Sequence, residues 1–93
     1  MEITRFRLSA GVGEAEFLRA DKALQEDVAY QQPGLLRRTT ARGEDGWVVV
    51  DLWRSAEDAD AGVGAGGADP AVVRFLSLVE AASLRTERYH EVG

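Results

Sequence analysis

Two side chains near the middle of the chain, Asp51 and Trp53, have the types and spacing that could support proton transfer on an aromatic molecule. They stand two residues apart in the apolar segment Trp47–Trp53, so in a β-strand both lie on the same face. Partial burial beside an aromatic wall raises the pKa of a carboxyl group and lets it act as a base toward a phenol or an acidic C–H group. The alternative is structural: Trp53 fills the core and Asp51 pairs with Arg5 or Arg7.

His90 and its neighbour Tyr89 form the second candidate for chemistry. Histidine titrates near neutral pH without any perturbation, so His90 could transfer protons; the alternative is an exposed histidine without a chemical role. We expect Phe6 and Tyr89 to join Trp53 in the wall of a ligand-binding site. Because the chain has one histidine and no cysteine, we expect neither a metal site nor a cofactor.

The composition limits the classes of partner. The chain has 93 residues, with 16 acidic and 11 basic side chains and a net charge of −5. The negative field repels polyphosphates, so we expect neither nucleic acid nor an anionic membrane as a partner. The lack of cysteine and of an apolar N-terminal segment favours the cytoplasm, and the length predicts one domain over residues 1–93.

The elements that must position these residues follow from periodicity and from turn residues. Alternation predicts strands at residues 2–8, 35–42, 47–53 and 84–91, and helical spacing predicts helices at 14–31, 55–62 and 70–81. Gly46 closes a tight hairpin loop between the second and third strands. Ser55 with Asp58 reads as a capping box, and Asp69 caps the last helix.

The order β-α-β-β-α-β predicts an α+β fold of the ferredoxin-like type. Its four-stranded antiparallel sheet has the order 4-1-3-2, with the helices on one face. The third strand is apolar on both sides, with Val48, Val50 and Leu52 on one and Trp47, Val49 and Trp53 on the other. Since the chain has nothing left to cover the second face, we expect a homodimer in which two sheets face each other.

The glycine-rich stretch after the second helix matches a nucleotide-binding pattern only formally. Gly62, Gly64 and Gly67 fit G-x-G-x-x-G, but that fingerprint requires a preceding strand, and here a helix precedes it. We interpret the stretch as a flexible loop that could cover the mouth of a pocket.

Two short motifs carry a family resemblance. Pro33-Gly34 precedes the second strand, and Trp53-Arg54-Ser55 joins the third strand to an alanine-rich helix. With the order of elements, these motifs resemble the antibiotic biosynthesis monooxygenase-like proteins of the dimeric α+β barrel superfamily over nearly the whole chain. The resemblance implies a dimer of facing sheets, with a pocket between sheet and helices in each subunit and Trp53 in its wall.

Two branches of that family carry out chemistry in the pocket. Haem-degrading members combine a tryptophan at the position of Trp53 with an asparagine on strand one and a histidine in helix two. This chain has no asparagine, and its histidine is His90, so the resemblance does not extend to haem degradation. Cofactor-free oxygenases of aromatic polyketides also use an asparagine. The expected function is therefore binding of a small apolar or aromatic molecule, with cofactor-independent oxygenase chemistry or, alternatively, a non-catalytic binding or accessory homodimer.

Overall fold

The computed structural model describes residues 1–63 and 69–93. The strands are β1 (Glu2–Phe6), β2 (Leu35–Arg42), β3 (Trp47–Trp53) and β4 (Arg85–Arg88). The α-helices are α1 (Glu14–Asp27), α2 (Ala56–Val63) and α3 (Pro70–Ser77), and short 3-10 helices cover Ala29–Gln31 and Ala81–Ser83. The predicted order β-α-β-β-α-β is confirmed, with the last helical region divided between α3 and a 3-10 turn.

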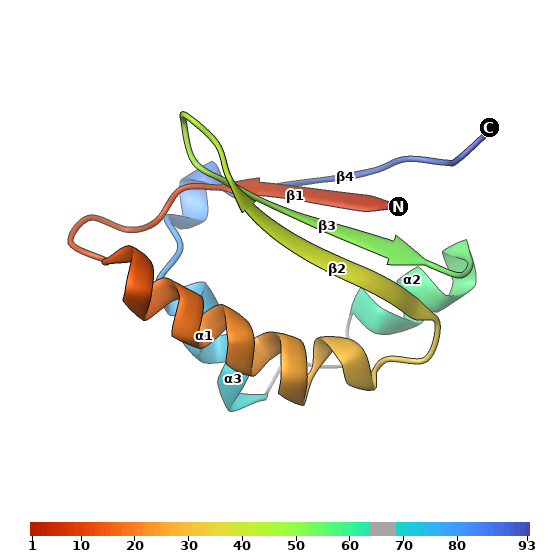
Figure 1. Cartoon of the computed structure of the whole chain (residues 1–93), viewed down its shortest axis with the longest axis horizontal. Helices are drawn as coiled ribbons and strands as arrows, with labels where there is room; N and C mark the ends of the chain where they lie inside the picture. The colour runs from red at the N-terminus through yellow and green to blue at the C-terminus, as the bar shows by residue number, and fades with distance from the viewer. Residues whose placement is uncertain (64–68) are drawn as a thin grey trace.

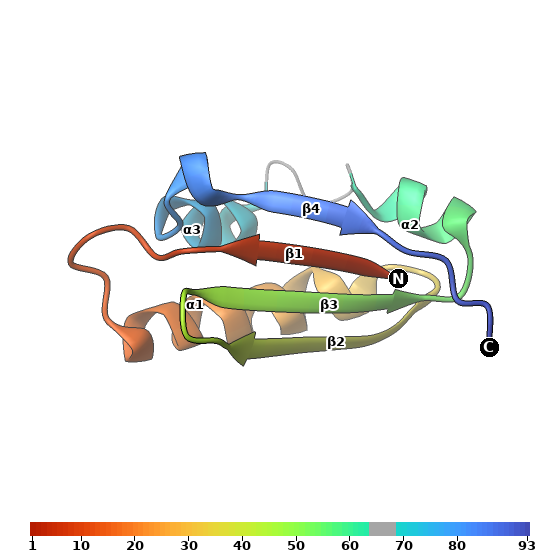
Figure 2. The ribbon, with the colours of Figure 1, turned by 90° about the horizontal axis from the view of Figure 1, so that it is seen from above.

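The four strands form one antiparallel sheet with the helices on one side of it (Figure 1). Its order is β2-β3-β1-β4, which is the predicted order read from the opposite edge, as Figure 2 shows from above. Among the described residues no element packs on the other face, where Ile3, Val48, Val50 and Leu52 are only partly buried. The fold is therefore of the ferredoxin-like α+β type, with one sheet face left open.

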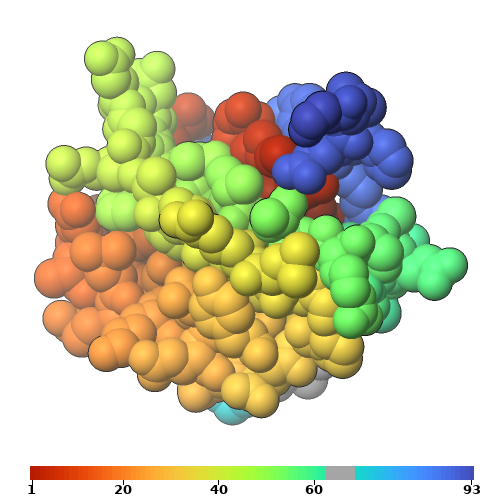
Figure 3. Space-filling model, turned by 45° about the vertical axis from the view of Figure 1, so that its right-hand side comes forward, coloured from red at the N-terminus to blue at the C-terminus, as the bar shows by residue number. Residues whose placement is uncertain are grey.

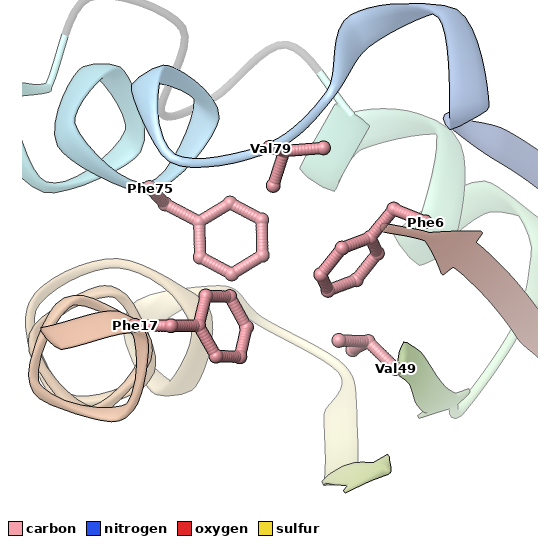
Figure 4. Packing of buried hydrophobic residues seen from close by; sticks show 5 residues of the cluster. All are labelled: Phe6, Phe17, Val49, Phe75 and Val79. Atoms are coloured by element: carbon pink, nitrogen blue, oxygen red, sulfur yellow. The ribbon is translucent and has the colours of Figure 1, made fainter. Parts of the chain in front are cut away.

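Aromatic residues from the sheet and the helices build the core. Phe6, Phe17, Val49, Phe75 and Val79 converge between the two layers (Figure 4). The ring centroids of Phe6, Phe17 and Phe75 lie 5.4 to 5.6 Å apart, in tilted and edge-to-face arrangements that aromatic quadrupoles favour. These contacts join β1, α1 and α3 and fix the distance between sheet and helices.

The predicted turns and caps are present. The amide of Gly43 donates to the carbonyl of Gly46 and closes the β2–β3 hairpin, whose tip projects from the body of the molecule (Figure 3). The hydroxyl of Ser55 accepts from the amide of Asp58 and donates to its carboxylate. Asp69 accepts a hydrogen bond from the amide of Ala71, with Pro70 at the start of α3. These local signals therefore place the element boundaries correctly where they occur.

Several element ends differ from the prediction. Helix α1 ends at Asp27, because Val28 leaves the helical region at φ −125° and a separate 3-10 turn follows. Strand β1 ends at Phe6, and Leu8 makes only an isolated bridge to Val79. Strand β4 ends at Arg88, opposite Glu2 of β1, so His90 lies beyond the strand in which it was expected.

The glycine-rich stretch extends beyond the described residues. Gly62 belongs to α2, while Gly64 and Gly67 of the predicted flexible loop lie outside the described residues. Over the described ranges, no helix is both long and apolar enough to cross a membrane.

Candidate functional site

A cavity of about 200 Å³ lies between the sheet and the helices, on the side of β3 that carries Trp53. Its wall is mainly apolar, formed by Leu24, Ala29, Leu35, Val49, Trp53 and Phe75. Four polar side chains complete it: Thr4, Gln32, Arg38 and Asp51. An apolar cavity with a few polar groups is the ordinary form of a small-molecule site, although this volume is below the ~300 Å³ lower end for drug-sized ligands.

Strand alternation brings Asp51 and Trp53 to this cavity together. Val49, on the same face of β3, is buried in the core against Phe17, which fixes the parity of the strand. Asp51 and Trp53 follow at positions i+2 and i+4 and so also face the helices. The prediction that Trp53 faces the helices is confirmed, and Leu52 belongs to the open face.

The side chain of Asp51 is partly buried, with 21% of it exposed, and one of its two carboxylate oxygens is fully buried. Its Oδ1 atom has no hydrogen-bond partner among the described residues. Burial raises the pKa of Asp51 from its ordinary 3.8 to about 6, against the opposing charge of Arg38 and with smaller upward contributions from Glu2 and Asp21. A carboxyl group of this kind ionises near neutral pH and retains a free acceptor, which suits a general base.

The structural alternative, in which Asp51 pairs with Arg5 or Arg7, is wrong about the partner. Arg5 and Arg7 project from the open face or its edge, where they pair with Glu87 and Glu80. The cation beside Asp51 is Arg38, whose Nε atom lies 3.9 Å from Oδ1 of Asp51.

Arg38 is a candidate site residue that the sequence did not reveal. Only 8% of its surface is exposed, and its Nη2 atom donates to Oδ1 of Asp21 at 2.7 Å. The guanidinium carbon lies 6.0 Å from the ring centre of Phe75, within reach of a cation–π contact. One signal was available, because Asp21 follows Phe17 by four residues on the apolar stripe of α1, where a carboxylate requires a partner.

The Trp53 ring is held by a hydrogen bond from its indole nitrogen and by contact with α2. Nε1 donates to Oε1 of Glu2 at 3.2 Å, and the other oxygen of Glu2 accepts from Arg88 at 2.8 Å. Arg88 also pairs with Asp60 of α2 at 2.6 Å. The ring lies against Gly62, where an added Cβ would overlap it. Because its indole N–H is already engaged, Trp53 lines the cavity as an aromatic side chain without a free donor.

The other expected site residues do not line this cavity, but Trp53 lines a second hollow that two of them share. His90 and Tyr89 are exposed and line a separate surface hollow of about 200 Å³ near the N-terminus of α2. Phe6 is 3% exposed and belongs to the core. The structure thus brings Asp51 and Trp53 together in the cavity, and Trp53 together with Tyr89 and His90 in the surface hollow, while Phe6 joins neither group. The expected roles of His90, Tyr89 and Phe6 stay predictions.

A larger hollow of about 390 Å³ lies elsewhere, below the hairpin tip, between Gly43, Gly46 and Val48 and the arginines Arg5 and Arg7. It opens on the uncovered side of the sheet and contains neither Asp51 nor Trp53. Across residues 1–63 and 69–93, no group of three histidine, cysteine, aspartate or glutamate side chains is arranged to hold a metal ion.

Comparison by sequence finds no matching family profile and no matching curated protein. Comparison by structure finds close matches. SnoaB, a cofactor-independent oxygenase from Streptomyces nogalater, superposes with a TM-score of 0.79 at 19% identity, over 99% of this chain and 91% of that one. A Nitrosomonas europaea protein provisionally assigned as an antibiotic biosynthesis monooxygenase gives a TM-score of 0.75 at 17% identity, with coverages of 99% and 97%.

A dimeric protein of unknown function and ferredoxin-like fold from Bacteroides fragilis gives a TM-score of 0.63 at 13% identity, over 97% and 93% of the two chains. The chain therefore has the fold of SnoaB and of these monooxygenase-like proteins. The resemblance expected from Pro33-Gly34 and Trp53-Arg54-Ser55 is confirmed at the level of structure.

Proposed function

We propose that the protein belongs with the cofactor-independent oxygenases of this fold and binds a small aromatic molecule in the cavity beside Trp53. Asp51 serves as the base that accepts a proton from an acidic O–H or C–H group of that molecule. The observation that carries the proposal is the partly buried carboxyl group of Asp51, which lines a mainly apolar cavity and whose Oδ1 atom lacks a hydrogen-bond partner among the described residues. A ligand donor at the exposed part of this carboxyl group would supply a hydrogen bond that the described residues do not supply.

The similarity to SnoaB supports the reaction class, because that protein is a cofactor-independent oxygenase. A SnoaB variant with an asparagine replaced by alanine also matches, with a TM-score of 0.77. This chain has no asparagine, so a polar group of another type must act in its cavity. Asp51 is the acidic side chain in the wall.

The chemistry balances with dioxygen as the sole co-reactant. Asp51 takes a proton from an activated CH₂ group, and the resulting carbanion transfers electrons to dioxygen as a C–O bond forms. Return of the proton gives a hydroperoxide, which loses water and leaves a carbonyl group. Carbon is oxidised, one oxygen atom enters the product, and the other leaves as water. The face of Trp53 and the apolar wall hold the flat ring system against Asp51.

One observation favours a second candidate, a binding or accessory homodimer without turnover. His90 lies outside the cavity, so among the described residues no histidine lines the cavity beside Asp51. In that case Asp51 would only accept a hydrogen bond from the ligand.

Uptake of dioxygen distinguishes the two functions. With anthrone, whose CH₂ group is acidic, the purified protein should consume dioxygen above the protein-free rate. Asp51→Asn should lower kcat by on the order of 100-fold, the usual contribution of a general base. Asp27→Asn, the same change at an exposed position of α1, is the matched control and should have no effect. Saturable binding without uptake would favour the accessory protein, and neither binding nor uptake would overturn the proposal.

A second copy of the chain covers the open sheet face in this proposal. Ile3, Val48, Val50 and Leu52 form an apolar strip there, and the structural neighbour from Bacteroides fragilis is dimeric. Facing sheets would bury this strip symmetrically.

A further inference from the structure

Asp21 does not line the cavity but contacts Arg38, the cation that lies beside Asp51. Nη2 of Arg38 donates to Oδ1 of Asp21 at 2.7 Å, and the two side chains are only 4% and 8% exposed. Nη1 of Arg38 lies 3.4 Å from Oε1 of Gln25 and 3.4 Å from Oγ1 of Thr40. Both terminal nitrogens of the guanidinium are therefore engaged by α1 and by β2 itself.

This arrangement leaves only Nε of Arg38 near Asp51. The distance of 3.9 Å from Nε to Oδ1 is too long for a hydrogen bond. A guanidinium whose terminal nitrogens were free could turn and bind the carboxylate through two charge-assisted hydrogen bonds. The Asp51 carboxylate would then be paired with Arg38 and would no longer be an unpaired acceptor for a ligand.

We propose that Asp21 is a positioning residue that holds the Arg38 guanidinium away from Asp51 and so keeps the Asp51 carboxylate unpaired for a ligand. The inference rests on the proposed function of Asp51. It assigns the buried ion pair of α1 and β2 to the control of the site rather than to packing alone.

The charges around Asp51 fix the direction of the expected effect. Arg38 from β2, Glu2 from β1 and Asp21 from α1 act on Asp51, and Glu2 in turn pairs with Arg88 from β4. Arg38 lowers the pKa of Asp51, whereas Asp21 raises it. Loss of the Asp21 charge and rotation of Arg38 toward Asp51 therefore both lower that pKa.

Carbon-13 NMR of the Asp51 carboxyl group tests the proposal without any substrate. In the full chain, Asp21→Asn should move the midpoint of the Asp51 titration down by at least one pH unit, a tenfold change in proton affinity. Glu14→Gln, which neutralises an exposed ion pair on the same helix, should leave the midpoint unchanged. The spectrum of Asp51→Asn identifies the signal. An unchanged or higher midpoint in Asp21→Asn would overturn the proposal.

A second measurement keeps the test decisive if Asp21→Asn fails to fold. In the unaltered protein, the Nε signal of Arg38 should shift as Asp51 titrates, while the Nη2 signal, held by Asp21, stays constant. Equal shifts of both signals would contradict the positioning role. These signals report protonation and not turnover. Absence of oxygenase activity would therefore overturn the proposed function, while the NMR signals would still show whether Asp21 holds Arg38 in place.

Discussion

Asp51 destabilises the fold at neutral pH. Burial raises its pKa to about 6, whereas in the unfolded chain the group returns to its ordinary value of 3.8. Between these values the folded protein holds a proton that the unfolded chain has released. The free energy of unfolding therefore falls as the pH rises from about 4 to about 6 and stays reduced above that range.

Asp51→Asn should therefore stabilise the protein at about pH 7.5 by roughly 1 to 3 kcal/mol, because asparagine does not carry the desolvated charge. At pH 4 and below, where Asp51 is protonated in the folded state, the difference should nearly vanish. Urea unfolding at the two pH values measures both effects. A loss of stability at pH 7.5 would identify Asp51 as a required structural partner of Arg38 and would argue against its role as a free base.

Gly62 determines where the Trp53 ring can lie. A methyl group at this position would overlap the indole, so Gly62→Ala should displace the ring despite the higher helix propensity of alanine. We predict a shift in tryptophan fluorescence and an at least tenfold weaker binding of 1-naphthol. Gly13→Ala, whose added methyl group has no neighbour within 4 Å, is the control. Unchanged fluorescence and affinity in Gly62→Ala would show that the ring does not depend on this contact.

At the scale of elements, β3 separates the candidate site from the open surface, because its two faces point to opposite sides of the sheet. Leu52→Asp places a charge on the open face and should convert the proposed dimer into folded monomers of 10.1 kDa. Trp53→Ala, on the opposite face, and Val73→Asp, on the exposed side of α3, should leave the dimer intact. Sedimentation at micromolar concentration measures the outcome. Dissociation by Trp53→Ala but not by Leu52→Asp would reverse the assignment of the faces.

The elements themselves could be predicted from sequence because their signals are local. Ser55 with Asp58 and Asp69 with Pro70 mark helix starts, and alternation in β3 gave the correct parity for Asp51 and Trp53. Element ends were less accurate, because the exit of Val28 from α1 depends on the packing that follows.

The partner of Asp51 could not be predicted because it depends on strand register. Leu35 pairs with Trp53, but Arg37 pairs with Leu52, so the β2–β3 ladder shifts by one residue at Leu36. Without this irregularity Arg37 would stand opposite Asp51; with it, Arg38 does. A bulge of this kind leaves no clear pattern in the sequence, and it decides which arginine is buried beside the candidate base.

At the scale of the whole molecule, a single layer of helices covers a single sheet, and hollows lie on both sides of that sheet. The cavity beside Asp51 lies between the layers, whereas the hollow below the hairpin tip opens on the uncovered face. In the proposed dimer of facing sheets, the hollow below the hairpin tip adjoins the interface. We therefore expect the aromatic ligand to bind in the cavity beside Asp51 and not in the hollow below the hairpin tip.

Mapping the binding of 1-naphthol by amide NMR tests this claim most directly. We predict that chemical shifts change mainly at Leu24, Ala29, Gln32 and Leu35, which line the cavity, and that affinity increases as Asp51 ionises around pH 6. Naphthalene, which lacks the hydroxyl group, should bind without this dependence on pH. Shift changes concentrated at Gly43, Gly46 and Val48, with an affinity independent of pH, would place the ligand below the hairpin tip and contradict the account.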